Sequence, residues 1–130
     1  MSTAGNAERI RNGYRAFNEA DLPALVDLFA EEVVWHFPGH CKFSGDHIGR
    51  DATLTMLGGM AESSNGTYRA ELHDVTASED HAMGWATDLG EREGRSLSVS
   101  AVVVFRMKDG KVVEAWHHFQ DVRQVEDFWA

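Results

Sequence analysis

Cysteine is nearly absent from this sequence, which has one thiol, Cys41, in 130 residues. A lone cysteine cannot form a disulfide within its own chain, so we expect a reducing, cytoplasmic location. Long apolar runs are also missing, and no stretch reaches the length that spans a bilayer. The N-terminus has no positively charged segment followed by an apolar one. We therefore expect neither a membrane span nor a secretory signal.

Basic side chains are scarce as well. Twelve lysines and arginines stand against 21 aspartates and glutamates, which gives a net charge of −9. This excess repels the phosphates of nucleic acids and the anionic surface of a membrane, so we expect neither as a partner. The content of 43% hydrophobic and 25% charged residues is ordinary for a soluble globular protein. At this length we expect one domain over residues 1–130.

Helical patterns occupy the first half of the chain. Residues 6–19 carry an apolar stripe with three- and four-residue spacing, formed by Ala7, Ile10, Tyr14 and Phe17. Asp21 is a suitable cap for a second helix, with Pro23 in its first turn and an inner face within residues 24–29. A third helix is expected over residues 51–61.

Strand patterns dominate the rest. The β-branched and aromatic residues 33–37 predict a short strand that Pro38 stops, followed by a loop over residues 38–49. Further strands are expected over residues 67–75, 81–91, 97–107 and 111–119, with a helical turn over residues 121–129. The last two strands are joined by Asp109-Gly110, a pair typical of tight hairpin turns. Helices followed by an antiparallel meander indicate an α+β domain whose sheet curls around the helices.

This order of elements resembles the NTF2-like superfamily, and most of all its SnoaL-like branch of polyketide cyclases, ketosteroid isomerases and limonene-type epoxide hydrolases. The segments that carry the resemblance are Phe17-Asn18-Glu19-Ala20-Asp21-Leu22, Leu28-Phe29-Ala30-Glu31-Glu32-Val33, Gly49-Arg50-Asp51-Ala52 and Asp109-Gly110-Lys111-Val112-Val113-Glu114-Ala115-Trp116. It covers nearly the whole chain. It implies a cone with the N-terminal helices packed in a strongly curved, mixed but mainly antiparallel sheet. It also implies a pocket between helices and sheet, and a homodimer that often forms through the outer face of the sheet.

The catalytic residues of these enzymes are only partly matched. Phe37 stands where the ketosteroid isomerases have their aspartate base. Asp88 matches one aspartate of the epoxide hydrolases, but Ala86 replaces their arginine. In the polyketide cyclases the acid/base aspartate lies near the end of the last strand, and here His118 and Asp121 lie there. We therefore expect neither steroid isomerisation nor epoxide hydrolysis by those mechanisms.

His118 is the best acid/base candidate, because an imidazole can accept and return a proton at neutral pH. Asp88 or Asp121 would be its partner. We favour Trp116 and His118 as the inward pair, although a bulge within residues 112–115 decides whether His117 or His118 faces the pocket.

An aromatic and aliphatic lining is expected for that pocket. Strand alternation puts one apolar set of the penultimate strand on the inner face. With the resemblance, the expected substrate-binding residues are Tyr14, Trp35, Phe37, Val99, Ala101, Val103 and Trp116. The seven histidines show no HxH or HExxH spacing, so we expect no metal, and no cofactor.

Two functions remain open from the sequence. The first is binding of a small apolar organic molecule, which we expect to be cyclic, by a cofactor-free cyclase, isomerase, lyase or hydrolase that uses His118 with Asp88 or Asp121. The second is a non-catalytic ligand-binding or dimeric interaction protein with the same fold.

Overall fold

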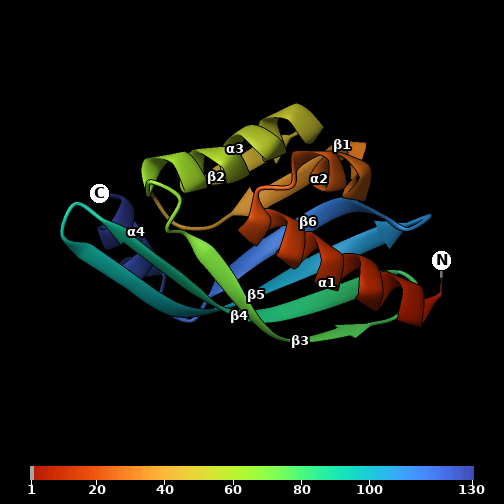
Figure 1. Cartoon of the computed structure of the whole chain (residues 1–130). Helices are drawn as coiled ribbons and strands as arrows, with labels where there is room; N and C mark the ends of the chain where they lie inside the picture. Colours follow the sequence, from red (N-terminus) through yellow and green to blue (C-terminus); the bar gives the residue numbers. More distant parts are fainter. Residues whose placement is uncertain (1) are drawn as a thin grey trace.

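Four helices and a six-stranded sheet make up residues 2–130, the part of the chain described in a computed structural model (Figure 1). The helices are α1 (Thr3–Glu19), α2 (Leu22–Leu28), α3 (Arg50–Ser63) and α4 (Val122–Trp129). The strands are β1 (Phe29–Phe37), β2 (Gly45–Ile48), β3 (Arg69–Ala77), β4 (His81–Arg92), β5 (Arg95–Lys108) and β6 (Lys111–Phe119). The α+β class predicted from the sequence is confirmed.

The sheet is mixed and mainly antiparallel. Its strand order is β2-β1-β6-β5-β4-β3, and β1 runs parallel to β6 while all other neighbours are antiparallel. Figure 1 shows α1 crossing one face of β3 and β4, with α2 and α3 on the same side. α4 lies near the end of the sheet where β4 turns into β5. The helices and the inner sheet face therefore enclose the core.

Local signals set the starts of the first two helices. The Ser2 hydroxyl accepts a hydrogen bond from the Gly5 amide at 3.0 Å at the start of α1. The Asp21 carboxylate accepts one from the Ala24 amide at 3.2 Å, and Pro23 occupies the first turn of α2. These bonds satisfy amides that have no partner within a helix. The predicted cap at Asp21 is confirmed.

The hairpin turn predicted at Asp109-Gly110 is confirmed, and a second turn of the same kind lies at Glu93-Gly94. Asp109 and Gly110 have φ angles of 52° and 76°, and Glu93 and Gly94 have 49° and 78°. Two successive positive φ angles define the turn that matches the twist of a two-residue hairpin, and glycine is the residue that adopts them without strain. These turns join β5 to β6 and β4 to β5.

Two element predictions were wrong. The inner face of the second helix was expected to reach Phe29, but α2 ends at Leu28 and Phe29 begins β1. The expected loop over residues 38–49 contains β2, whose partner is β1, with Trp35 opposite His47. Gly45 and Asp46, the first two of its four residues, are of types depleted in strands, so this strand depends on pairing with β1.

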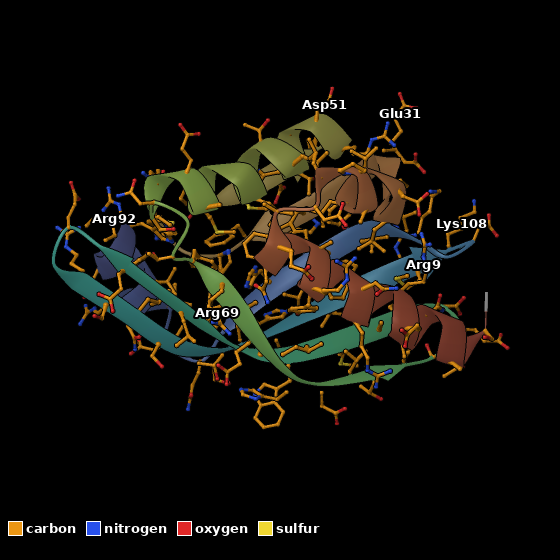
Figure 2. The ribbon with its side chains drawn as sticks, viewed as in Figure 1. Arg9, Glu31, Asp51, Arg69, Arg92 and Lys108 are labelled. Carbon is orange, nitrogen blue, oxygen red and sulfur yellow. The ribbon has the colours of Figure 1, made fainter. Side chains whose placement is uncertain are left out.

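Charged side chains lie on the outside of this arrangement. Figure 2 shows Glu31, Asp51 and Lys108 extending away from the ribbon, and all three are exposed. None of the described helices is long and apolar enough to cross a membrane.

Candidate functional site

A cavity of about 60 Å³ lies between the first three helices and the inner face of the sheet. Its lining is almost wholly apolar and includes Tyr14, Trp35, Ala101 and Val103 from the predicted set. Phe37 and Val99 are buried but do not belong to the lining. The lining also contains the polar side chains of Tyr68, Asp88 and His117.

Asp88 lies on the inner face of β4, where only 3% of its surface is exposed. Its place is fixed by the register with β5, which sets it opposite the buried Val99. The Tyr68 hydroxyl donates a hydrogen bond of 2.5 Å to Asp88 Oδ2. A buried carboxylate is costly unless it has such a partner, so the pair holds a polar centre in an apolar space.

His117 lies next to this carboxylate. It sits opposite the inward Val103 in the pairing of β5 with β6, and it is 7% exposed. Its Nε2 is 3.5 Å from Asp88 Oδ2, which is within ion-pair distance. Neither ring nitrogen has a hydrogen-bond partner among the described residues. The ring is instead held by aromatic neighbours, with centroids 4.3 Å from Phe119 and 5.2 Å from Phe37.

The predicted orientation of Trp116 and His118 is wrong. His118 is exposed and pairs with Val102, and Trp116 pairs with Val104, so both point to the outer face. A bulge does exist, since Arg106 pairs with Glu114 and Met107 with Val112. Because the extra residue lies before Glu114, the strand alternates regularly from there to its end and turns His117 inward.

Asp121 also lies outside the cavity. It caps α4, where its carboxylate accepts a hydrogen bond from the Gln124 amide at 3.2 Å, and its side chain is exposed. Of the two carboxylates considered as partners of a histidine, only Asp88 lies beside one. That histidine is His117.

Two tyrosines keep their protons next to this pair. Burial, and then the charge of Asp88, raises the pKa of Tyr14. Burial also raises the pKa of Tyr68 well above its ordinary value, with further contributions from the charge and the hydrogen bond of Asp88. Both phenols therefore remain hydrogen-bond donors at neutral pH. The Tyr14 hydroxyl lies 3.4 Å from the carbonyl oxygen of Gly84.

Trp35 adds a further polar group to the lining. It is 5% exposed, and its Nε1 has no hydrogen-bond partner among residues 2–130. Its ring meets Phe29, Phe105 and His117 at centroid distances of 6.0, 5.9 and 5.7 Å. Sequence reasoning placed Trp35 in the lining for its aromatic surface and missed this free donor. Tyr68 was missed altogether, and its only sequence signal is its place at the start of the strand predicted over residues 67–75, although the strand itself begins at Arg69.

A second polar cluster lies on the outer face of the sheet. His36 makes two contacts of 2.6 Å, from Nδ1 to Asp46 Oδ1 and from Nε2 to Glu114 Oε2. Arg106 also donates to Glu114, at 3.2 Å. Glu114 and then Asp46 raise the pKa of His36, and the bond to His36 lowers that of Glu114. Among the described residues, no three His, Cys, Asp or Glu side chains are arranged to hold a metal ion.

Comparison with known proteins adds the family. The model of the SnoaL-like domain matches residues 10–115. Bal32a, from a soil-derived mobile gene cassette, is 37% identical over 98% of both chains, with a TM-score of 0.96. An NTF2-like protein of unknown function from Burkholderia pseudomallei is 23% identical over 100% of this chain and 99% of that one, with a TM-score of 0.86. A putative polyketide cyclase from Sinorhizobium meliloti is 22% identical over 85% of this chain and 94% of that one, with a TM-score of 0.69.

Proposed function

The chain belongs to the SnoaL-like domain family, and from this premise we propose that it binds a small, mainly apolar organic molecule in the cavity and moves a proton on it. The observation that carries this proposal is the Asp88–His117 pair. Two titratable side chains 3.5 Å apart, both nearly inaccessible to solvent, line an otherwise apolar space. Buried polar groups of this kind are costly for stability and are found where function requires them.

The proposed chemistry uses His117 as the acid/base group in place of His118. Because Asp88 lies beside Nε2, it favours the neutral imidazole that carries its proton there, and the lone pair of Nδ1 is then free. Nδ1 takes a proton from the ligand, Asp88 stabilises the imidazolium, and the proton later returns to the ligand. Tyr68 orients Asp88 through its hydrogen bond. Enolisation, cyclisation, isomerisation and elimination all need this transfer, and none of these steps needs a cofactor.

The cavity limits the size of the ligand. Its volume of about 60 Å³ is well below the roughly 300–1,000 Å³ of pockets that hold drug-sized molecules. A second cavity of about 120 Å³ adjoins it and shares Gly13 and Leu28. Leu28 packs so closely over Gly13 that a Cβ there would lie 2.6 Å from Leu28 Cδ2. A ligand that fills more than the first cavity therefore needs Leu28 to turn aside.

The exchange of α-hydrogens of cyclopentanone in D₂O tests the chemistry, because removal of one such proton is the first step of enolisation. We expect the protein to accelerate exchange, and His117→Gln or Asp88→Asn to reduce the acceleration by about 10²-fold or more. His118→Gln, on the outer face, is the matched control and should exchange like the parent protein. Equal rates for the parent and the two inner variants would remove the pair from the mechanism.

The small size of the cavity favours a second function, which is ligand binding without catalysis. Pockets of one fold serve both purposes, so fold does not decide between them. A titration of cyclopentanone followed by NMR, run beside the exchange assay, separates the two. Saturable binding without accelerated exchange would support the non-catalytic alternative.

We also propose a homodimer through the outer sheet face. Trp85 and Met83 on β4 are 51% and 44% exposed, and the half-buried Val102 and Val104 of β5 lie beside them. Exposed apolar side chains gathered on one sheet face are typical of an interface. Sedimentation should show a dimer that Trp85→Glu weakens, with Glu62→Gln, at an exposed position of α3 on the helix side of the molecule, as a control. A monomer across the micromolar range would refute this assembly.

A further inference from the structure

The indole N–H of Trp35 indicates which class of ligand the cavity binds, and the aromatic surface of the ring does not. An indole N–H can only donate a hydrogen bond. That of Trp35 is buried, and no described residue accepts from it. A donor left without an acceptor in a protein interior costs about 1–3 kcal/mol, so most such groups are satisfied by some partner. Since Trp35 lines the cavity, a molecule inside it is the available partner.

The aromatic neighbours of the indole do not accept its hydrogen. Phe29 and Phe105 flank the ring, and neither side chain has an acceptor atom. The nearby imidazole of His117 has its own two nitrogens unbonded, so it does not accept from Trp35. Two rings that line the cavity, 5.7 Å apart, therefore carry an unused N–H donor on β1 and an unused imidazole on β6.

We propose that Trp35 Nε1 donates a hydrogen bond to an oxygen of the ligand, so that the cavity selects a small carbonyl or other oxygen-acceptor compound over a hydrocarbon of the same shape. This inference rests on the ligand binding proposed above, and it deepens it by naming the ligand class. Trp35 anchors the oxygen while the neighbouring His117 faces the atoms beside it. A ligand oxygen at this donor makes a hydrogen bond that a hydrocarbon leaves unmade.

Cyclopentanone and methylenecyclopentane are the probes, because they differ only in C=O against C=CH₂. Both have six non-hydrogen atoms, as benzene has, and a cavity of roughly 150 Å³ admits benzene in an engineered protein. Each probe therefore needs Leu28 to turn aside, which joins the cavity of about 60 Å³ to the adjoining one of about 120 Å³. NMR titration of the parent protein should give a ketone affinity about 5- to 100-fold higher than that of the hydrocarbon, from the cost of leaving the donor unpaired. Trp35→Phe should remove most of this preference.

Trp129→Phe is the matched control. Trp129 is 3% exposed and its Nε1 also lacks a partner among the described residues, but it does not line the cavity. This variant should keep the full preference for the ketone. Equal affinity of both probes in the parent protein, or a preference that survives Trp35→Phe, would overturn the assignment of Trp35. Failure of the parent protein to bind either probe would instead overturn the proposed ligand binding itself.

A measurement on the parent protein covers the case in which Trp35→Phe does not fold. The four tryptophans give four indole N–H signals in a ¹H–¹⁵N spectrum. Saturating ketone should shift the Trp35 signal downfield and slow its hydrogen exchange, while that of Trp129 stays in place. The hydrocarbon should not slow the exchange of either. A Trp35 signal that responds equally to both probes would contradict the hydrogen bond.

Discussion

The cluster around His36 predicts a pH dependence of stability whose sign follows from its contacts. Both ring nitrogens face carboxylates at 2.6 Å, and only the imidazolium donates to both. The raised pKa of His36 means that its contribution is complete below its ordinary value of 6.5 and is lost as the pH rises through the raised value. The lowered pKa of Glu114 means that the contribution of Glu114 to stability is complete above its ordinary pKa of 4.5. It is lost as the pH falls through the lowered value.

The size of this contribution to the free energy of unfolding follows from how exposed the three side chains are. Asp46 has 63% of its side chain exposed, so its contact is worth about 0.2–1 kcal/mol. His36 and Glu114 are 29% and 25% exposed, and a charged hydrogen bond in that setting contributes about 1 kcal/mol after allowance for solvent screening. His36→Phe keeps a ring that can stack on Trp116, which now lies 5.7 Å away. At pH 5.5 it should therefore cost about 1–2 kcal/mol, or roughly 4–8 °C in Tm.

Thermal unfolding followed by circular dichroism at pH 5.5 and pH 9 tests this. The difference in Tm between His36→Phe and the parent protein should shrink towards zero at pH 9, where the neutral ring of His36 leaves one carboxylate without a donor. His81→Phe, at an exposed histidine whose ring makes no hydrogen bond with the described residues, is the control and should change little at either pH. An equal loss at both pH values would refute the charged arrangement.

Three further substitutions test the inner face and its supports by urea unfolding. Tyr68→Phe removes the donor to Asp88 and should cost about 1.5–3 kcal/mol; an unchanged stability would mean that this bond does not form. Gly84→Ala places a Cβ 2.5 Å from the Tyr14 hydroxyl and should cost about 1–3 kcal/mol by displacing that ring, whereas a neutral result would mean that Tyr14 lies elsewhere. Gly58→Ala, at an exposed position of α3 with no atom near the new methyl group, should stabilise by about 0.5–1 kcal/mol, and a loss would contradict the helix.

Local signals in the sequence predicted most of the fold. Helix caps such as Asp21 and turns such as Asp109-Gly110 act within a few residues, so their chemistry can be read without a structure. β2 escaped prediction because its strand state depends on pairing with β1, which is a contact between segments that the sequence does not reveal. The resemblance supplied the mixed, mainly antiparallel sheet with the helices packed in it, which local patterns do not contain.

The site was predicted only in part, because the register of β6 decides which of its histidines faces the cavity. Asp88 was one of two carboxylates proposed from the sequence as the partner of a histidine, and it is buried in the lining of the cavity. The choice between His117 and His118 depended on the position of a single bulged residue, and a shift of one position reverses every side chain after it. Tyr68 and the free donor of Trp35 are defined by contacts across the core. No spacing in the sequence encodes such contacts.

A crystal structure of the protein grown with saturating cyclopentanone is the most direct test of the central claim that Asp88, His117 and Trp35 form one ligand site. We predict density for the ring inside the cavity, with its oxygen within hydrogen-bond distance of Trp35 Nε1 and its α-carbon facing His117. A cavity closed by repacked side chains, with His117 hydrogen-bonded to the protein and no ligand density, would contradict it.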